Sequence, residues 1–276
     1  MNMEKEKIIE MQKLANDIRK DIVRAAFVAG KNGCHLGGCL SMAEMLAVLY
    51  SDFVDLDCAS LESRDRVIMS KGHGALALYS VLHYKGFVTD DELSTFEKNG
   101  SNFTAHAHRN ILKGIEYTGG SLGLGMSFAT GVAYACKLRR QNNRVYCFLG
   151  DGEMNEGIVW EAMMFASQKH LANLTIIVDY NHLQIGGRCE DIINMTPLKD
   201  KFESFGFNVT TVDGHNVEDL YNAYCCISKD KPNAIIAETV KGKGLKLTEG
   251  KYKWHFGVLT EEKYKKAMKE LGINLN

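Results

Sequence analysis

Short apolar runs bounded by turn residues recur through the second half of the chain. Two of them, Val145–Leu149 and Leu174–Val178, span five residues each, which predicts strands buried on both faces of a sheet. Residues 156–169 between them have helical periodicity, so the unit predicts two parallel strands joined by a right-handed crossover. The same kind of run predicts further strands at Asn208–Val212 and Ala234–Ala237.

The first half of the chain is dominated by helical patterns. Residues 4–29 place apolar side chains at helical spacing among charges. Ser41 followed three residues later by Glu44 is typical of a capping box and predicts the start of a second helix. A short buried strand is expected at 67–69, followed by a helical run over 75–85.

The alternation of strands and helices predicts an α/β fold: a doubly wound, mostly parallel sheet flanked by helices. One more helix is expected from about Val217 to Ser228, and Thr260 is expected to cap a final one. There is no internal repeat, no low-complexity segment and no Pro-rich linker. Residues 1–276 are therefore expected to form a single domain.

The nearly balanced charge of the chain argues against binding to polyanions such as nucleic acid or an anionic membrane. Lys and Arg number 33 against 34 Asp and Glu, for a formal net charge of −1. We therefore expect no nucleic acid and no anionic membrane surface as a partner. No apolar run approaches the ~20 residues that span a bilayer, and the N-terminus lacks a hydrophobic signal core. The eight cysteines contain no CxxC pair, which favours a reducing cytoplasm over a secreted scaffold.

Candidate chemistry gathers where two of the predicted strands end. Asp151, flanked by Gly150 and Gly152, follows one strand, and Asn181 follows the next. Adjacent parallel strands would place the two side chains together, where ligands of such sheets settle. A Gly-Asp-Gly triplet alone is often only a turn. An Asp carboxylate, an Asn carbonyl and one main-chain carbonyl would, however, complete an octahedral magnesium shell with two diphosphate oxygens and water.

These segments resemble the thiamine diphosphate motif of transketolases, and further motifs follow in the family's order. Gly150–Gly157 together with Asn181–Ile185 carries the main resemblance, and a late histidine stands at Trp254-His255. Three other segments are similar to the family's active-site loops: Cys34–Ser41, Arg64–Gly74 and Gly114–Gly123. The resemblance covers nearly the whole chain.

The resemblance implies a role for each matching residue. The expected metal ligands are Asp151, Asn181 and the Leu183 carbonyl, binding Mg²⁺ or, in its place, Ca²⁺ or Mn²⁺. The residues expected to contact thiamine diphosphate are His73, Gly120, Ser121, Leu122, Gly152, Glu153, Asn181 and His255. The histidines expected to act in catalysis are His35, His73, His106 and His255. A neutral imidazole donates from one ring nitrogen and accepts at the other, which suits reversible proton movement on a sugar.

One histidine assignment stays open between two positions. The family has a His-Pro pair here, whereas this chain reads His106-Ala107-His108 without proline. Ungapped alignment to Gly114 favours His106 over His108. Two other departures are Leu124, where the family usually has glutamine, and Gly186, where it usually has aspartate.

The resemblance covers only the diphosphate-binding half of a complete enzyme. It implies that a partner chain, a C-terminal transketolase subunit, supplies the pyrimidine-binding domain and the activating glutamate. We expect a heterotetramer with two copies of each chain, although a truncated piece of a longer enzyme is an alternative. The implied reaction moves a two-carbon ketol unit from a ketose phosphate to an aldose phosphate, as in pentose phosphate metabolism, with the cofactor as electron sink.

Several alternatives remain open from the sequence. Specialised ketol transferases use sulfo-sugars, branched sugars or formaldehyde, and most residues that would read the far end of the substrate lie outside this chain. A 2-oxo acid dehydrogenase α-subunit would not explain the Ser70–His73 loop or the late His255. A 1-deoxyxylulose-5-phosphate synthase fits the first loop and Asn155-Glu156-Gly157 less well. A non-catalytic protein that only binds the cofactor is disfavoured by the complete set of histidines and metal ligands.

Overall fold

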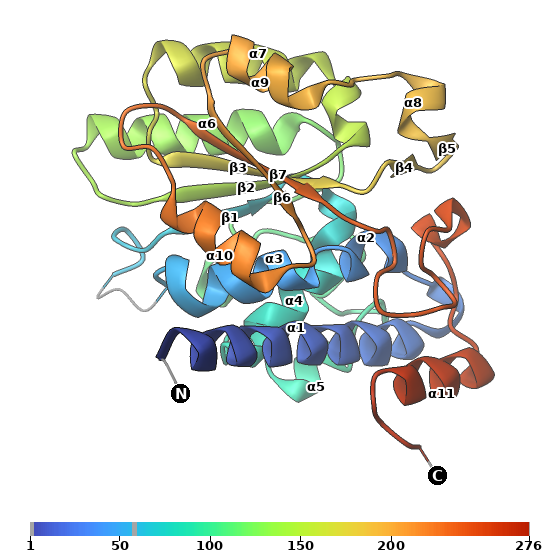
Figure 1. The fold of residues 1–276 in the computed structure, drawn as a ribbon. Helices are drawn as coiled ribbons and strands as arrows, with labels where there is room; N and C mark the ends of the chain where they lie inside the picture. Colours follow the sequence, from blue (N-terminus) through green and yellow to red (C-terminus); the bar gives the residue numbers. More distant parts are fainter. Residues whose placement is uncertain (1–2, 57–59, 276) are drawn as a thin grey trace.

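A five-stranded parallel sheet organises the chain, in the strand order β1-β2-β3-β7-β6 (Figure 1). The computed structural model describes residues 3–56 and 60–275. Leu183–Gln184 and Gly187–Arg188 add a small antiparallel pair, β4 and β5. The parallel strands are β1 (Arg66–Met69), β2 (Val145–Gly150), β3 (Leu174–Tyr180), β6 (Asn208–Asp213) and β7 (Asn233–Glu238). The predicted fold class, a mostly parallel sheet flanked by helices, is confirmed.

Helices cover both faces of this sheet. Figure 1 shows α6, α7 and α9 on one side and α1, α3, α4 and α10 on the other, and each set packs onto its own apolar core. The helices are α1 (Met3–Val28), α2 (Leu36–Leu40), α3 (Ala43–Val48), α4 (Ala75–Tyr84), α5 (Asp90–Leu93), α6 (Leu124–Leu138), α7 (Gly157–Gln168), α8 (Cys189–Ile192), α9 (Leu198–Ser204), α10 (Val217–Cys225) and α11 (Glu261–Glu270). Single turns of 3-10 or π type lie at Gly30–Asn32, Leu49–Phe53, Gly72–Gly74, Ile111–Lys113, Gly152–Asn155 and Tyr252–His255.

The central strands are buried from end to end, as their apolar runs predict. All six residues of β2 are buried, and so are the first six of β3. The register pairs Gly150 of β2 with Asp179 of β3, and Asp179 with Ala237 of β7. The carboxyl ends of three neighbouring strands therefore meet at one edge, which is where the segments after Gly150, Tyr180 and Glu238 enter loops.

Most of the predicted helices and strands are confirmed, with small shifts at their ends. The final helix has Thr260 as its N-cap, and the Thr260 side chain accepts from the Lys263 amide. The helix expected to reach Ser228 ends at Cys225. No helix in the described ranges is both long and apolar enough to cross a membrane.

The predicted capping box at Ser41 is wrong. Met42 precedes α3, and no side chain caps that helix. The Ser41 hydroxyl instead donates to Asp179 at 2.7 Å, and Glu44 forms a buried ion pair with Arg19. Tertiary partners outcompete the local pattern here because both side chains are buried, where each polar group must find a partner.

Candidate functional site

The predicted metal-binding residues converge at the carboxyl edge of the sheet. Asp151 and Asn181 line one cavity of about 460 Å³ together with Leu183. The Asp151 carboxylate accepts from the Gly152 amide at 2.7 Å and from the amide of His182. The Asn181 side chain accepts from the Leu183 amide at 3.2 Å through Oδ1. These hydrogen bonds hold the two side chains in place beside the cavity.

The donor set fits a hard divalent cation that also binds an anionic ligand. Within the described ranges, no group of three or more His, Cys, Asp or Glu is placed to hold a metal ion. Asp151, Asn181 and the Leu183 carbonyl supply one carboxylate and two neutral oxygens, so phosphate oxygens or water must complete the shell. Burial, together with the charge of Asp179, raises the pKa of Asp151 to about 6. A cation at this position would stabilise the ionised carboxylate.

Two buried lysines face the same cavity, and sequence analysis assigned them no role. Lys71, directly after β1, forms an ion pair with Asp179, and neither side chain is exposed to solvent. Lys241, shortly after β7, donates to the Leu183 carbonyl at 2.8 Å. Although burial opposes it, the Lys71 ammonium and the Thr239 and Ser41 hydroxyls hold the pKa of Asp179 below its ordinary value. The Lys71 ammonium is already matched by Asp179 and also donates to the Gly38 carbonyl at 3.0 Å, so Lys241 is the ammonium of the two that suits an anionic ligand.

Four histidines from four separate segments meet at the cavity. The ring centroid of His35 lies 5.8 Å from that of His73, 5.0 Å from that of His106 and 5.4 Å from that of His255. His73 and His255 are 5.0 Å apart. Both His106 and His108 are exposed, but only His106 is among the residues that line the cavity. The geometry therefore groups His106, the position that the alignment favours, with the other three.

Three of these imidazoles, those of His35, His73 and His255, have a lowered pKa and are neutral near pH 7. Burial, followed by the proximity of His106 and Lys241, lowers the pKa of His35 to about 4. Burial and Lys241 lower the pKa of His255 to about 3, and burial and Lys71 hold the pKa of His73 well below its usual range. Each neutral ring has one donor and one acceptor nitrogen available for a sugar hydroxyl or carbonyl.

Glycines allow the loops around the cavity to approach closely. A Cβ on Gly72 would lie 2.6 Å from the Gly120 amide nitrogen, and one on Gly152 would lie 2.8 Å from the Gln184 side chain. Gly120 and Leu122 line the cavity, whereas Ser121 is exposed and is not among its lining residues. Glycine at positions 72 and 152 therefore lets neighbouring loops pack against each other where a side chain would clash with them.

Glu153 lines the cavity but is also tied to the loops that shape it. One carboxylate oxygen accepts from the Ser70 hydroxyl at 2.5 Å and from the Gly123 amide at 2.7 Å, and the other from the Gly150 amide at 3.1 Å. Burial raises the pKa of this carboxyl. Glu153 thus joins three loops of the site to one another.

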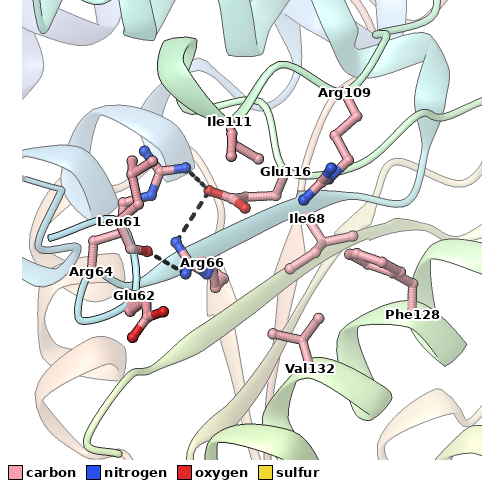
Figure 2. A pocket seen from close by; sticks show the side chains of 10 residues that line it. All are labelled: Leu61, Glu62, Arg64, Arg66, Ile68, Arg109, Ile111, Glu116, Phe128 and Val132. Atoms are coloured by element: carbon pink, nitrogen blue, oxygen red, sulfur yellow. Dashed lines mark hydrogen bonds and ion pairs between the residues drawn. The ribbon is translucent and has the colours of Figure 1, made fainter.

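A second cavity of about 250 Å³ lies beside the loop that carries His106 and Gly120. Figure 2 shows the Glu116 carboxylate between the guanidinium groups of Arg64 and Arg66. The Arg64–Glu116 pair is almost fully buried, with side-chain exposures of 2% and 8%. Together with Arg66, the first residue of β1, this pair anchors the loop to the start of β1 and so holds the segment that leads to Gly119 and Gly120.

Replacing Glu116 with glutamine should lower the free energy of unfolding by about 3–5 kcal/mol, because it leaves the buried Arg64 charge without its partner. Chemical denaturation monitored by circular dichroism measures the change. Glu190→Gln is the matched control, because Glu190 pairs with Arg188 in an exposed position and should cost below about 1 kcal/mol. Equal losses in the two variants would contradict an anchoring role for Glu116.

The sheet edge, its oxygen donors and its buried lysines define an α/β domain that binds a diphosphate-type ligand at the carboxyl ends of its strands. The family described as "Transketolase, thiamine diphosphate binding domain" matches residues 10–276. The chain therefore belongs to the transketolase family, and the resemblance predicted from its motifs is confirmed.

Two relatives of similar length are named as subunits. The chain is 40% identical to the 6-deoxy-6-sulfo-D-fructose transketolase subunit of Clostridium sp. strain MSTE9, over 96% of this chain and 98% of the relative. It is 38% identical to an apulose-4-phosphate transketolase subunit of Phocaeicola vulgatus, over 95% of this chain and 93% of the relative. The transketolase of Leishmania mexicana superimposes with a TM-score of 0.88 at 30% identity, covering 96% of this chain but 41% of that longer one.

Proposed function

We propose that this chain is the diphosphate-binding subunit of a two-chain transketolase that moves a ketol unit from a ketose donor to an aldose acceptor. One observation carries the proposal: three oxygen donors, two buried lysines and four histidines surround a single cavity. The oxygen donors and lysines suit a metal-bound diphosphate, and the histidines suit a polyhydroxylated substrate. A site for a diphosphate alone would not need the four histidines, and a site for a sugar alone would not need the oxygen donors and lysines.

Asp151, Asn181 and the Leu183 carbonyl are the residues that would hold Mg²⁺, with Ca²⁺ or Mn²⁺ as substitutes. Lys241 would face the diphosphate, Gly152, whose amide donates to Asp151 in the unliganded chain, would lie next to it, and the Gly120–Leu122 backbone would lie beside the rest of the cofactor. Thiamine diphosphate, when bound, supplies the carbanion chemistry and the electron sink that protein side chains lack. The chain's own contribution is to bind, orient and neutralise the charge of this group.

The histidines would act on the sugar. His35 and His255 would hold substrate hydroxyls and the carbonyl, and His73 and His106 would complete the ring of donors and acceptors around the reacting carbons. Because burial keeps at least His35 and His255 neutral, each can accept a proton from a hydroxyl and return it without first losing one of its own.

A partner chain would complete the enzyme. Support comes from the two relatives of matching length, which are named as subunits, and from the solved transketolase of which this chain covers 41%. The partner would contribute the pyrimidine-binding domain and the activating glutamate, in a heterotetramer with two copies of each chain. The cofactor would then lie between the two kinds of subunit.

The identity of the sugars divides into two candidates. One relative is named for a sulfonated ketose and another for apulose-4-phosphate, so a specialised ketol donor stands beside the ordinary pentose phosphates. A screen of the reconstituted pair with xylulose 5-phosphate, 6-deoxy-6-sulfofructose and apulose 4-phosphate, with pyruvate as a negative donor, identifies the substrate. Turnover of pyruvate in place of every ketose would contradict the transketolase assignment.

Cofactor affinity should fall as the pH rises above about 8. Burial and the nearby Lys71 charge lower the pKa of Lys241 to about 8. In the unliganded chain, the charged form of Lys241 therefore lowers the free energy of unfolding at pH values below 8. This loss disappears as the pH rises towards 10.5, the ordinary pKa of lysine. A bound diphosphate favours the charged form, so binding takes up a proton above pH 8, and the Kd should rise by up to about tenfold per pH unit.

Calorimetric titration of thiamine diphosphate at roughly pH 9, in two buffers of different ionisation enthalpy, measures this proton uptake. Lys241→Met should abolish it. Lys243→Met is the control, because the Lys243 side chain is at the surface beside Glu249. Proton uptake that persists without Lys241 would contradict the assignment.

A further inference from the structure

Three polar side chains from distant parts of the chain meet behind the cofactor cavity. Arg19 of α1 donates to Glu44 of α3 at 2.5 Å, and His215, in the connection from β6 to α10, lies 3.1 Å from the same Glu44 oxygen. Their side chains are 6%, 4% and 12% exposed. Although burial alone would raise it, His215 and Arg19 lower the pKa of Glu44. None of the three lines the cofactor cavity.

Each end of this group holds the main chain of one short segment, residues 240–243. The Arg19 Nε–H donates to the Lys243 carbonyl at 3.1 Å. At the other end, the Val240 amide donates to Nε2 of His215 at 2.8 Å. Because Nε2 accepts a hydrogen bond, the ring is neutral with its proton on Nδ1, which donates to Glu44.

Lys241 lies within this segment, between the anchored Val240 amide and the anchored Lys243 carbonyl. Its ammonium donates to the Leu183 carbonyl at 2.8 Å and lies 3.3 Å from Nδ1 of His255. The packing around the segment is close, since a Cβ on Gly244 would lie 2.9 Å from Cδ of Arg19. The position of the Lys241 backbone, and hence the reach of its ammonium, depends on the contacts that hold residues 240–243.

We propose that Arg19, Glu44 and His215 form a clamp that positions Lys241 for the diphosphate group of the cofactor. The clamp acts only through Lys241 and touches neither the cofactor nor the substrate, so its members are positioning residues. The inference rests on the proposed role of Lys241 at the cofactor site. It predicts that loosening the clamp weakens cofactor binding much more than an equal loss of stability elsewhere does.

The test compares His215→Ala with His83→Ala in the full-length chain. His83 forms a partly buried pair with Asp21, at 2.7 Å, that joins α4 to α1 away from the cavity, and its Nε2 lies 3.3 Å from the exposed Asp90, so the control also loses histidine–carboxylate contacts. Isothermal titration with thiamine diphosphate and Mg²⁺ should show a Kd roughly tenfold higher for His215→Ala and within about twofold of the original for His83→Ala. Thermal unfolding of both variants records the structural cost of each change.

Two further variants keep the test decisive. Arg19→Lys retains the charge beside Glu44 but loses the Nε donor to Lys243, so it should raise the Kd without unfolding the chain. His215→Gln retains an acceptor for the Val240 amide and should restore part of the lost affinity. Failure of both expectations, or a Kd that simply follows the loss of stability in every variant, overturns the clamp.

A double-mutant cycle with Lys241→Met shows whether the effect passes through Lys241. If it does, His215→Ala should weaken binding about tenfold in the original chain and less than about twofold when Lys241 is already absent. Additive effects would overturn the clamp while leaving the cofactor site intact. If Lys241→Met alone leaves the Kd unchanged, both the clamp and the proposed role of Lys241 are wrong. The metal site is tested separately, by the binding of the cofactor to an Asp151 variant.

Discussion

Purified on its own, the chain should show no ketol transfer, and activity should appear when the partner chain is added. The carboxylates that line the cofactor cavity are Asp151 and Glu153. Asp151 accepts from two main-chain amides, and Glu153 accepts from the Ser70 hydroxyl and two more amides. Among the described residues that line the cavity, both carboxylates are thus engaged in hydrogen bonds to this chain, and we expect the activating glutamate to come from the proposed partner chain.

The expected effect is large because a positioned acid–base group contributes about 10²–10⁴-fold to the rate of a reaction, and the proposed partner would also supply half of the cofactor's surroundings. The measurement is a coupled assay of aldose phosphate release, at fixed cofactor and Mg²⁺, as the partner is titrated against a constant amount of this chain. Activity should saturate at one partner per chain. Turnover by this chain alone, at a rate similar to that of the mixture, would falsify the two-chain assignment.

Asp151→Asn should abolish Mg²⁺-dependent binding of thiamine diphosphate, raising the Kd at least about a hundredfold, which corresponds to about 2.7 kcal/mol. Asp151 is the only carboxylate among the three proposed ligands, and the other two are the neutral oxygens of Asn181 and Leu183. Mg²⁺ prefers negatively charged oxygen donors. The asparagine side chain has the same shape as aspartate, so the substitution keeps the geometry of the site but removes most of the electrostatic attraction for the metal ion. Titration calorimetry with and without chelator measures the metal-dependent part.

Asp191→Asn serves as the control for this change, because Asp191 is exposed and lies outside the cavity. It removes the same charge from the chain but should leave the Kd unchanged. A variant at Asp151 that binds the cofactor normally in the presence of Mg²⁺ would show that the metal site lies elsewhere.

Linear patterns were enough to locate Asp151 and Asn181 but not to find the lysines that accompany them. The two metal-site candidates follow long apolar strands, and the parallel register then places them together. Lys71 and Lys241 also follow strands β1 and β7. Lys71 lies in the Arg64–Gly74 loop that resembles the family, but that resemblance gave it no role, and a lysine shortly after an apolar run is usually a solvated side chain.

Local patterns failed where tertiary partners compete for the same side chain. Ser41 and Glu44 have the spacing of a capping box, yet each is buried against a residue far away in the chain, Asp179 and Arg19. The choice between His106 and His108 likewise depends on where the loop runs. The Glu116–Arg64 ion pair holds this loop. Because the two residues are far apart in the sequence, no local pattern predicts their contact.

The order of apolar strands and amphipathic helices was readable along the chain, because the periodicity of buried side chains reflects each element's own geometry. The same holds for the glycine-flanked Asp151 after β2, since strand ends and turns are local features. The assembly of the cavity was decided in three dimensions. Four histidines, two buried lysines and the Arg19–Glu44–His215 clamp come from segments whose proximity depends on which faces pack together, and burial, rather than residue type, sets the protonation of His35, His255 and Lys241.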